Sequence, residues 1–169
     1  MNGTASHENE MRITIILLIL LFPGLLLADQ LHAIINGVAY HFDRSRNFNE
    51  QNWGYGFEYN FEQRGKWTPL LTGSSFKDSR NHTSNYLGGG IKTRYMLGSG
   101  DTGLHIDVGV VAFLMTRKDY KNNRPFLGAL PFISVGNEYV AINATYIPKI
   151  SPKHARLLFF QLMIKIAEF

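Results

Sequence analysis

The chain has 169 residues, a formal net charge of +4 and no cysteine. This length indicates one domain, and the lack of cysteine excludes disulfides, thiolate metal sites and cysteine nucleophiles. The basic residues are scattered along the chain, so we expect no nucleic-acid interface. Aromatic residues make up 13% and glycine occurs 16 times, which favours short strands and tight turns over helices.

The N-terminus has the pattern of a secretory signal peptide. Arg12 precedes an apolar run over 13–22, which is followed by Pro23-Gly24 and closes on Ala28 before a polar residue. This run is short and interrupted, unlike a membrane-spanning helix. We expect residues 1–28 to be a signal peptide, with Met11 as a second candidate start, and residues 29–169 to be the folded domain. An uncleaved anchor is the alternative, because Leu26 is bulky for its place near the cleavage point.

The rest of the chain divides into segments of about ten residues that are rich in β-branched and aromatic types and are separated by turn residues. They predict eight strands, at 30–41, 53–61, 67–77, 86–97, 103–116, 126–136, 139–147 and 155–168. An even number of strands closes an antiparallel barrel. We therefore predict an all-β fold, an eight-stranded antiparallel up-and-down transmembrane β-barrel. A soluble lipocalin-like barrel is the alternative.

The connections favour the membrane barrel. Those after the second, fourth and sixth strands are predicted to be tight, and those after the first, third, fifth and seventh to be longer and polar. Outer-membrane barrels have short turns at the periplasmic end and long loops at the outer end. The chain also ends on Phe169, a terminal aromatic like the one that barrel-assembly machinery reads.

The last strand has one apolar and one mixed face. The mixed face contains Lys165 and Gln161, and the apolar face consists of Leu158, Phe160, Leu162, Ile164 and Ile166. Either the apolar face contacts lipid, or the interior of the barrel is itself apolar.

Four stretches resemble the lipid A palmitoyltransferases of the PagP type, in the order and spacing of that family. They are Asn49 to Phe57 (NEQNWGYGF), Phe76 to Ser79 (FKDS), Leu130 to Gly136 (LPFISVG) and Thr145 to Pro148 (TYIP). The resemblance implies an eight-stranded outer-membrane barrel that works at its outward face. Such a barrel moves an acyl chain from a phospholipid to lipid A. It also implies that no cofactor is needed, and we expect a monomer.

The resemblance implies roles for particular residues. Asp78 and Ser79 match the Asp-Ser pair of the family at the outer end of the third strand. Gly90 matches a glycine at the floor of the acyl pocket that limits chain length. Pro131 and Pro148 match prolines that open a lateral gate, since proline leaves a gap in strand hydrogen bonding.

The chain also departs from the family pattern. Strand 1 is predicted to begin almost at the signal cleavage site, without the amphipathic N-terminal helix of the family. Asn52 replaces the proline before the Trp-Gly pair, so a second lateral opening is not expected. Ile35 occupies the position that aligns, without gaps, with the catalytic histidine of the family.

Two histidines can supply the base. His41 lies at the predicted outer end of the first strand, on the side where Ser79 ends the third, whereas His32 lies at the inner end. In regular alternation His41 shares a face with Ile35 and His32 does not. Imidazole titrates near neutral pH and can accept a hydroxyl proton. We therefore predict His41, Asp78 and Ser79 as catalytic residues, together at the outer rim above an acyl pocket that reaches toward Gly90.

The same residues also have structural interpretations without catalysis. Asp78-Ser79 can be a turn that closes the third strand, and His41 can be a histidine of the rim. Asn36-Gly37 indicates a β-bulge. The remaining histidines are too widely spaced to indicate a metal site. The alternative functions are a barrel without catalysis, structural or lipid-binding, and a lipid A acyl hydrolase that uses the same rim residues.

Overall fold

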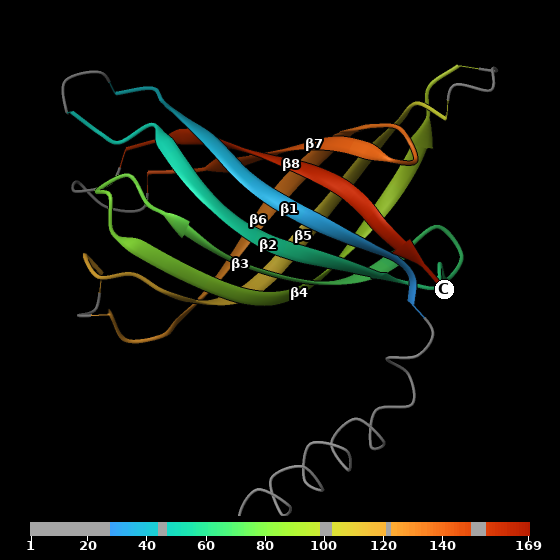
Figure 1. Cartoon of the computed structure of the whole chain (residues 1–169), viewed down its shortest axis with the longest axis horizontal. Helices are drawn as coiled ribbons and strands as arrows, with labels where there is room; N and C mark the ends of the chain where they lie inside the picture. Colours follow the sequence, from blue (N-terminus) through green and yellow to red (C-terminus); the bar gives the residue numbers. More distant parts are fainter. Residues whose placement is uncertain (1–27, 44–46, 99–102, 121–122, 150–154) are drawn as a thin grey trace, which may run out of the picture.

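The computed structural model describes residues 28–43, 47–98, 103–120, 123–149 and 155–169. Within them the chain forms a closed antiparallel barrel in which each strand pairs with its neighbours in sequence and β1 pairs with β8 (Figure 1). The strands are β1 (Ala28–His41), β2 (Gln51–Phe61), β3 (Thr68–Lys77), β4 (Thr83–Met96), β5 (His105–Thr116), β6 (Phe126–Gly136), β7 (Val140–Ile147) and β8 (Leu157–Glu168). The predicted eight-stranded up-and-down barrel is confirmed.

The N-terminal signal-peptide prediction lies outside the described residues, apart from Ala28, where β1 begins. The described part of the chain contains no helix that is long and apolar enough to span a membrane.

Figure 1 shows the connections that follow odd-numbered strands gathered at one end of the barrel. The connections after even-numbered strands lie at the other end, with the C-terminus. Two predicted lengths differ from the structure. The connection after β4, predicted to be tight, spans 97–104 and is longer than the connection after β3. The third connection is a tight turn over 78–82, because the Asp78 amide donates to the carbonyl of His82 and Asn81 adopts a positive φ of 62°. This turn lets β3 and β4 pair from Lys77 and Thr83 onward.

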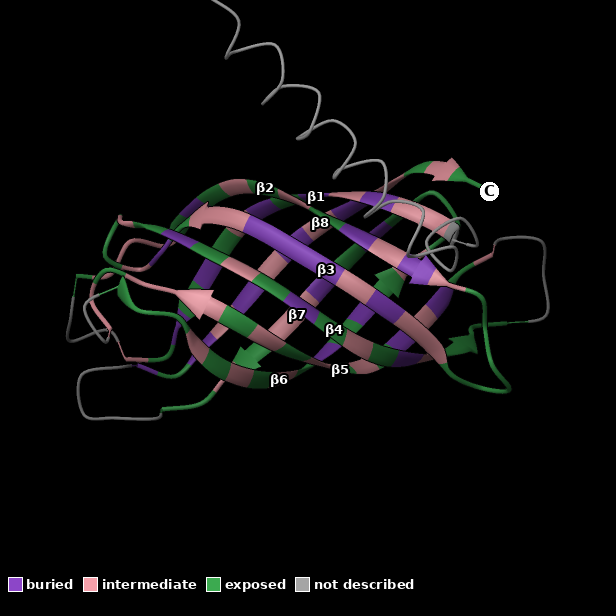
Figure 2. Cartoon of the chain, turned by 90° about the horizontal axis from the view of Figure 1, so that it is seen from below, coloured by how far each residue is buried: buried purple, intermediate pink, exposed green. Residues whose placement is uncertain are grey.

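The two faces of the wall differ in polarity, as Figure 2 shows by the alternation of buried and exposed residues along the strands. Exposed side chains include Leu127 and Tyr55, 81% and 77% accessible. Buried side chains include many polar and charged residues, among them His32, Asn36, Glu58, Thr72, Lys92, Asp107, Asn143 and Gln161. An apolar exterior around a partly polar interior is the arrangement of a membrane barrel and the reverse of a soluble protein. On β8, Phe159, Gln161 and Met163 are buried, so its apolar stripe faces outward and the first of the two predicted options is correct.

A β-bulge interrupts β1 at Asn36, Gly37 and Val38, as predicted. Asn36 pairs with Gly54 and Gln161, but the register shifts before the next pairs on both neighbouring strands. Ile34 and Asn36 are buried below the shift, and Ala39 and His41 are buried above it. The parity argument made from the sequence was therefore wrong. Ile35 is 40% exposed and faces outward, whereas His41 is 2% exposed and faces inward.

Paired charges lie inside the barrel, in the half nearer the connections that follow even-numbered strands. The Nζ atom of Lys92 lies 2.8 Å from Oε1 of Glu58 and 3.4 Å from Oδ2 of Asp107. Arg94 donates to both carboxylate oxygens of Asp107, at 2.7 and 2.8 Å. Buried carboxylates and ammonium groups need such partners. Each of these buried charges is therefore paired, and Glu58 also lines one end of the cavity described next.

Candidate active site

His41 and Ser79 come into contact at the end of the barrel where the connections after odd-numbered strands lie. The Nε2 atom of His41 lies 2.9 Å from the Oγ atom of Ser79. His41 ends β1, and Ser79 lies in the turn that follows β3, so β2 separates the strands that carry the two residues. Two inter-strand spacings amount to about 10 Å, so contact requires both side chains to point inward across the rim. The bulge in β1 provides this orientation for His41.

The His41 ring is held by residues that directly precede β2. The ring of Phe48 stacks on it, with centroids 4.5 Å apart and an interplanar angle of 13°. The Oε1 atom of Glu50 accepts the backbone N–H of His41 at 3.3 Å and lies 3.7 Å from its Nδ1 atom. The sequence analysis gave no role to Phe48 or Glu50. Glu50 does lie in the first stretch of family resemblance, which was the only signal that could have indicated it.

The carboxylate of Asp78 accepts hydrogen bonds from the turn that follows it. Its Oδ1 atom accepts the backbone N–H groups of Arg80 and His82, at 2.9 and 3.0 Å, and Oδ2 accepts the hydroxyl of Ser84 at 3.0 Å. Asp78 is thus adjacent to the His41–Ser79 pair, but its carboxylate is directed into the turn that follows Ser79. This geometry corresponds to the turn-forming interpretation.

His32, the competing histidine, lies near the inner end of β1. It is buried, and its Nδ1 atom is 3.3 Å from the amide nitrogen of Asn60. Because it pairs across the sheet with Glu58 and Lys165, it lies at the opposite end of β1 from His41. The geometry therefore favours His41 as the partner of Ser79.

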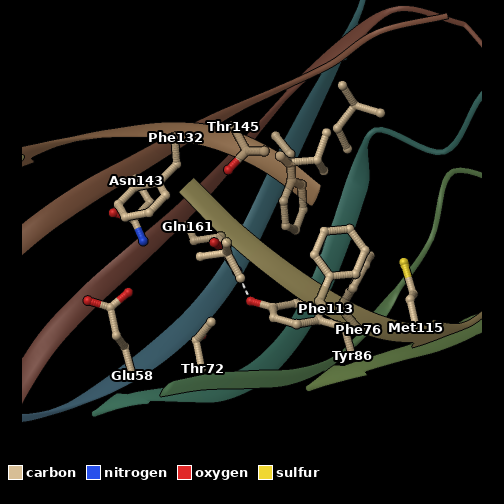
Figure 3. A pocket seen from close by; sticks show the side chains of 14 residues that line it. Glu58, Thr72, Phe76, Tyr86, Phe113, Met115, Phe132, Asn143, Thr145 and Gln161 are labelled. Carbon is tan, nitrogen blue, oxygen red and sulfur yellow. Dashed lines mark hydrogen bonds between the residues drawn. The ribbon is translucent and has the colours of Figure 1, made fainter. Parts of the chain in front are cut away.

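A cavity of about 100 Å³ occupies the barrel interior (Figure 3). Phe76, Phe113 and Met115 lie at one end of it, and Glu58 and Asn143 lie at the other. Its wall is mostly apolar, and the other lining residues are Thr72, Tyr86, Val111, Leu130, Phe132, Thr145, Ile147, Phe159 and Gln161.

An apolar layer separates this cavity from the His41–Ser79 pair. It consists of Ala39, Leu157 and Phe159, with Phe76 and Ile147 packed against them. Among the described residues, Phe76, Ile147 and Phe159 also line the cavity, whereas His41, Asp78 and Ser79 do not. An acyl chain that joined the two would lie where the rings of Phe76 and Phe159, 5.2 Å apart, now meet.

Gly90 lies beside the cavity rather than in its lining. It pairs with Leu70 and with Val111, and Val111 does line the cavity. A Cβ atom at Gly90 would lie 2.3 Å from the carbonyl oxygen of Val110. Any side chain at this position would therefore displace the neighbouring strand.

The wall of the barrel has an incomplete seam between β6 and β7. Their pairing runs only from Phe132 and Thr145 to Gly136 and Ala141, so residues 126–131 of β6 have no pairs on β7. Pro131 is the first residue beyond the paired region, and Pro148 directly follows β7. The cavity lies directly behind this seam, since Leu130 and Ile147 line it.

A group of charges links two loops at the same end. Arg117 binds Asp119 through both carboxylate oxygens, at 3.1 and 3.2 Å, and Arg80 reaches Asp119 at 3.0 Å. Burial alone would raise the pKa of Asp119, but the two arginines outweigh it and hold the pKa below the ordinary value.

Comparison with known proteins identifies relatives of the chain. A protein named lipid A acyltransferase PagP from Bordetella pertussis (strain CS) is 35% identical over 114 residues, which are 67% of this chain and 60% of the relative. Proteins of the same name from Methylobacillus flagellatus and Proteus mirabilis are 33% and 30% identical, over 65% and 67% of this chain and 58% and 53% of the relatives. The matched region thus spans less than two thirds of each relative.

A family profile gives the assignment. Residues 30–162 match the family described as "Antimicrobial peptide resistance and lipid A acylation protein PagP". This match covers most of the chain and nearly the whole barrel. The resemblance found in four short stretches therefore extends over the fold, and the chain belongs to the PagP family.

Proposed function

We propose that this chain is an outer-membrane acyltransferase that moves an acyl chain from a phospholipid to lipid A. The observation that carries the proposal is the 2.9 Å distance between Nε2 of His41 and Oγ of Ser79, at the outer end of a barrel with an apolar cavity. A base within hydrogen-bond reach of a hydroxyl is the arrangement that acyl transfer needs. The relatives are named for acylation of lipid A.

The chemistry proceeds in two balanced steps. His41 takes the proton of Ser79 as its Oγ atom attacks the ester carbonyl of the phospholipid, and the proton then passes to the departing lysophospholipid. In the second step His41 takes a proton from a lipid A hydroxyl, which attacks the acyl-serine and releases Ser79 with its proton restored. The products are lysophospholipid and acylated lipid A. The two steps involve no redox change, and in this proposal they need no cofactor. In this proposal Asp78 positions Ser79 through the turn that it stabilises.

The surroundings of the pair support this location and route. The apolar exterior fits a membrane, and the family and the barrel together favour the bacterial outer membrane, with the odd-numbered connections on the outer side. The seam between β6 and β7 offers a lateral path from the lipid phase to the cavity behind it. Pro131 and Pro148 bound this path. We expect the barrel to work as a monomer, with phospholipid and lipid A as its only partners.

The decisive experiment uses purified protein in mixed micelles with acyl-labelled phospholipid and lipid A. We expect labelled lipid A, and we expect loss of about 10²- to 10⁴-fold in rate for His41→Ala and Ser79→Ala. Labelled free fatty acid without labelled lipid A would identify a hydrolase. Equal signals from wild type and both variants would leave a barrel without catalysis.

A further inference from the structure

The three residues Phe48, Asn49 and Glu50 contact both members of the His41–Ser79 pair. Phe48 and Glu50 contact His41, as described above. Asn49 contacts the other side: its backbone N–H donates to the carbonyl of Ser79 at 2.9 Å, and its side-chain amide donates to the carbonyl of Asp78 at 3.1 Å. The carbonyl of Glu50 also accepts the N–H of Ala39 at 3.0 Å. This segment therefore bridges the outer ends of β1 and β3.

The position of the Glu50 carboxylate has a chemical consequence. Its Oε1 atom lies on the Nδ1 side of the His41 ring, 3.7 Å away, while the opposite nitrogen faces Ser79. A carboxylate beside Nδ1 favours the tautomer that carries the proton there, which leaves the Nε2 lone pair free to accept from a hydroxyl. It also stabilises the imidazolium that forms when this proton is accepted. Catalytic hydrogen bonds are often longer before substrate binds.

Asp78 is a second carboxylate near the pair, and its oxygens accept hydrogen bonds from Arg80, His82 and Ser84. Arg117 also approaches Asp78, to 3.8 Å. From these contacts we infer that Glu50, held in the Phe48–Glu50 segment, is the positioning residue that fixes the tautomer and orientation of His41. The structural part of this inference is independent of the proposed function, and its catalytic part rests on that function.

The first test measures the tautomer without any assay of activity. The nitrogen chemical shifts of the His41 ring are recorded on ¹⁵N-histidine-labelled protein in detergent, under conditions in which the ring is neutral, and are assigned by comparison with His41→Asn. We expect the Nδ1–H tautomer in wild type and in Glu62→Met, a control at the other end of β2 where the glutamate is exposed. We expect a mixture of tautomers in Glu50→Met and partial recovery in Glu50→Asp. A wild-type ring protonated at Nε2, or equal populations in wild type and Glu50→Met, would overturn the inference.

The second test measures kinetics on the same variants. We expect Glu50→Met to lower kcat by about 10²-fold or more with little change in KM, because the carboxylate acts on the imidazolium formed during reaction. Glu50→Asp should recover part of kcat. A loss confined to KM would contradict the role in positioning. Folding of Glu50→Met is judged by heat-modifiable gel mobility. If this variant does not fold, the tautomer of His41 in wild type and the change in tautomer populations in Glu50→Gln decide the question. An inactive wild type with the Nδ1–H tautomer would refute the proposed function and leave the positioning intact.

Discussion

The ring of Phe113 lies against Gly128 on the neighbouring strand, in the space that a side chain at Gly128 would need. A Cβ atom there would be 2.7 Å from two ring atoms of Phe113, and its three nearest neighbours all belong to that ring. Gly128→Ala should therefore push this ring into the cavity that it lines and shift the preference of the proposed acyltransferase toward shorter acyl chains. We expect the ratio of rates for long and short donors to fall about tenfold or more, as measured with phospholipids of defined chain length.

Gly89 provides the matched control, because a Cβ atom there meets its nearest neighbour at an ordinary 3.6 Å. Gly89→Ala should leave chain selection unchanged, and Phe113→Leu should restore long-chain use to Gly128→Ala. An unchanged preference in Gly128→Ala would show that the ring moves elsewhere.

The buried ion pair between Lys92 and Glu58 gives a prediction about stability. Lys92→Met removes the cation and leaves two carboxylates buried, which costs about 3–5 kcal/mol in such settings. Denaturant unfolding in lipid vesicles would measure this loss. Lys66→Met, at an exposed lysine, should change the unfolding free energy little. Adding Glu58→Gln to Lys92→Met should recover part of the loss, and additive effects of the two changes would contradict the pairing.

The bulge in β1 can be tested by labelling, because the chain has no native cysteine. Regular alternation would place Ile35 and Ala39 on one face, whereas the bulge places them on opposite faces. A membrane-soluble maleimide should react with Ile35→Cys and not with Ala39→Cys in the folded barrel. Both should react after unfolding, which controls for intrinsic reactivity. Equal labelling in the folded state would mean that β1 is regular.

Pro131 marks the upper limit of pairing between β6 and β7. Pro131→Ala restores a backbone donor that can extend the pairing, worth about 0.5–1.5 kcal/mol for one hydrogen bond. We expect turnover to slow about two- to tenfold, with thermal stability unchanged or raised. Pro69→Ala, within the paired region of β3, serves as a control away from the seam. Undiminished turnover in both Pro131→Ala and Pro148→Ala would exclude the gate.

Asp119 predicts a dependence of stability on pH. Because its folded pKa is lowered, its ion pairs with Arg117 and Arg80 stabilise the protein above the ordinary pKa of 3.8 and weaken as the pH falls through the folded pKa. Wild type should therefore be more stable than Asp119→Asn at neutral pH, and the difference should shrink in acid. Melting temperatures at stepwise lower pH would show this. A constant difference would mean that the ion pairs contribute nothing.

The sequence predicted the strands because a period of two and turn residues are local signals. It also predicted the pair His41 and Ser79 at one rim, since both residues end their strands on the same side. The choice of His41 was reached partly through a wrong premise, because the bulge moved Ile35 to the opposite face. One extra residue in a strand moves all later side chains to the opposite face. The position of that residue in β1 follows only from its pairing with both neighbouring strands.

Contacts across the interior could not be predicted in this way. Glu58, Lys92 and Asp107 lie on three strands, and their meeting depends on the register of each pair and on the curvature of the closed wall. The same holds for Phe48 and Glu50, whose contacts with His41 depend on the path of the first connection. The spacing of these residues in the sequence does not indicate that they contact one another.

The paired charges of Glu58, Lys92, Asp107 and Arg94 also bear on permeability. A closed wall of eight strands could leave a narrow aqueous conduit, but here carboxylates and cations from three strands are paired inside the barrel. An ion that entered the lumen would have to displace these pairs. We therefore expect the barrel to conduct ions and small solutes poorly.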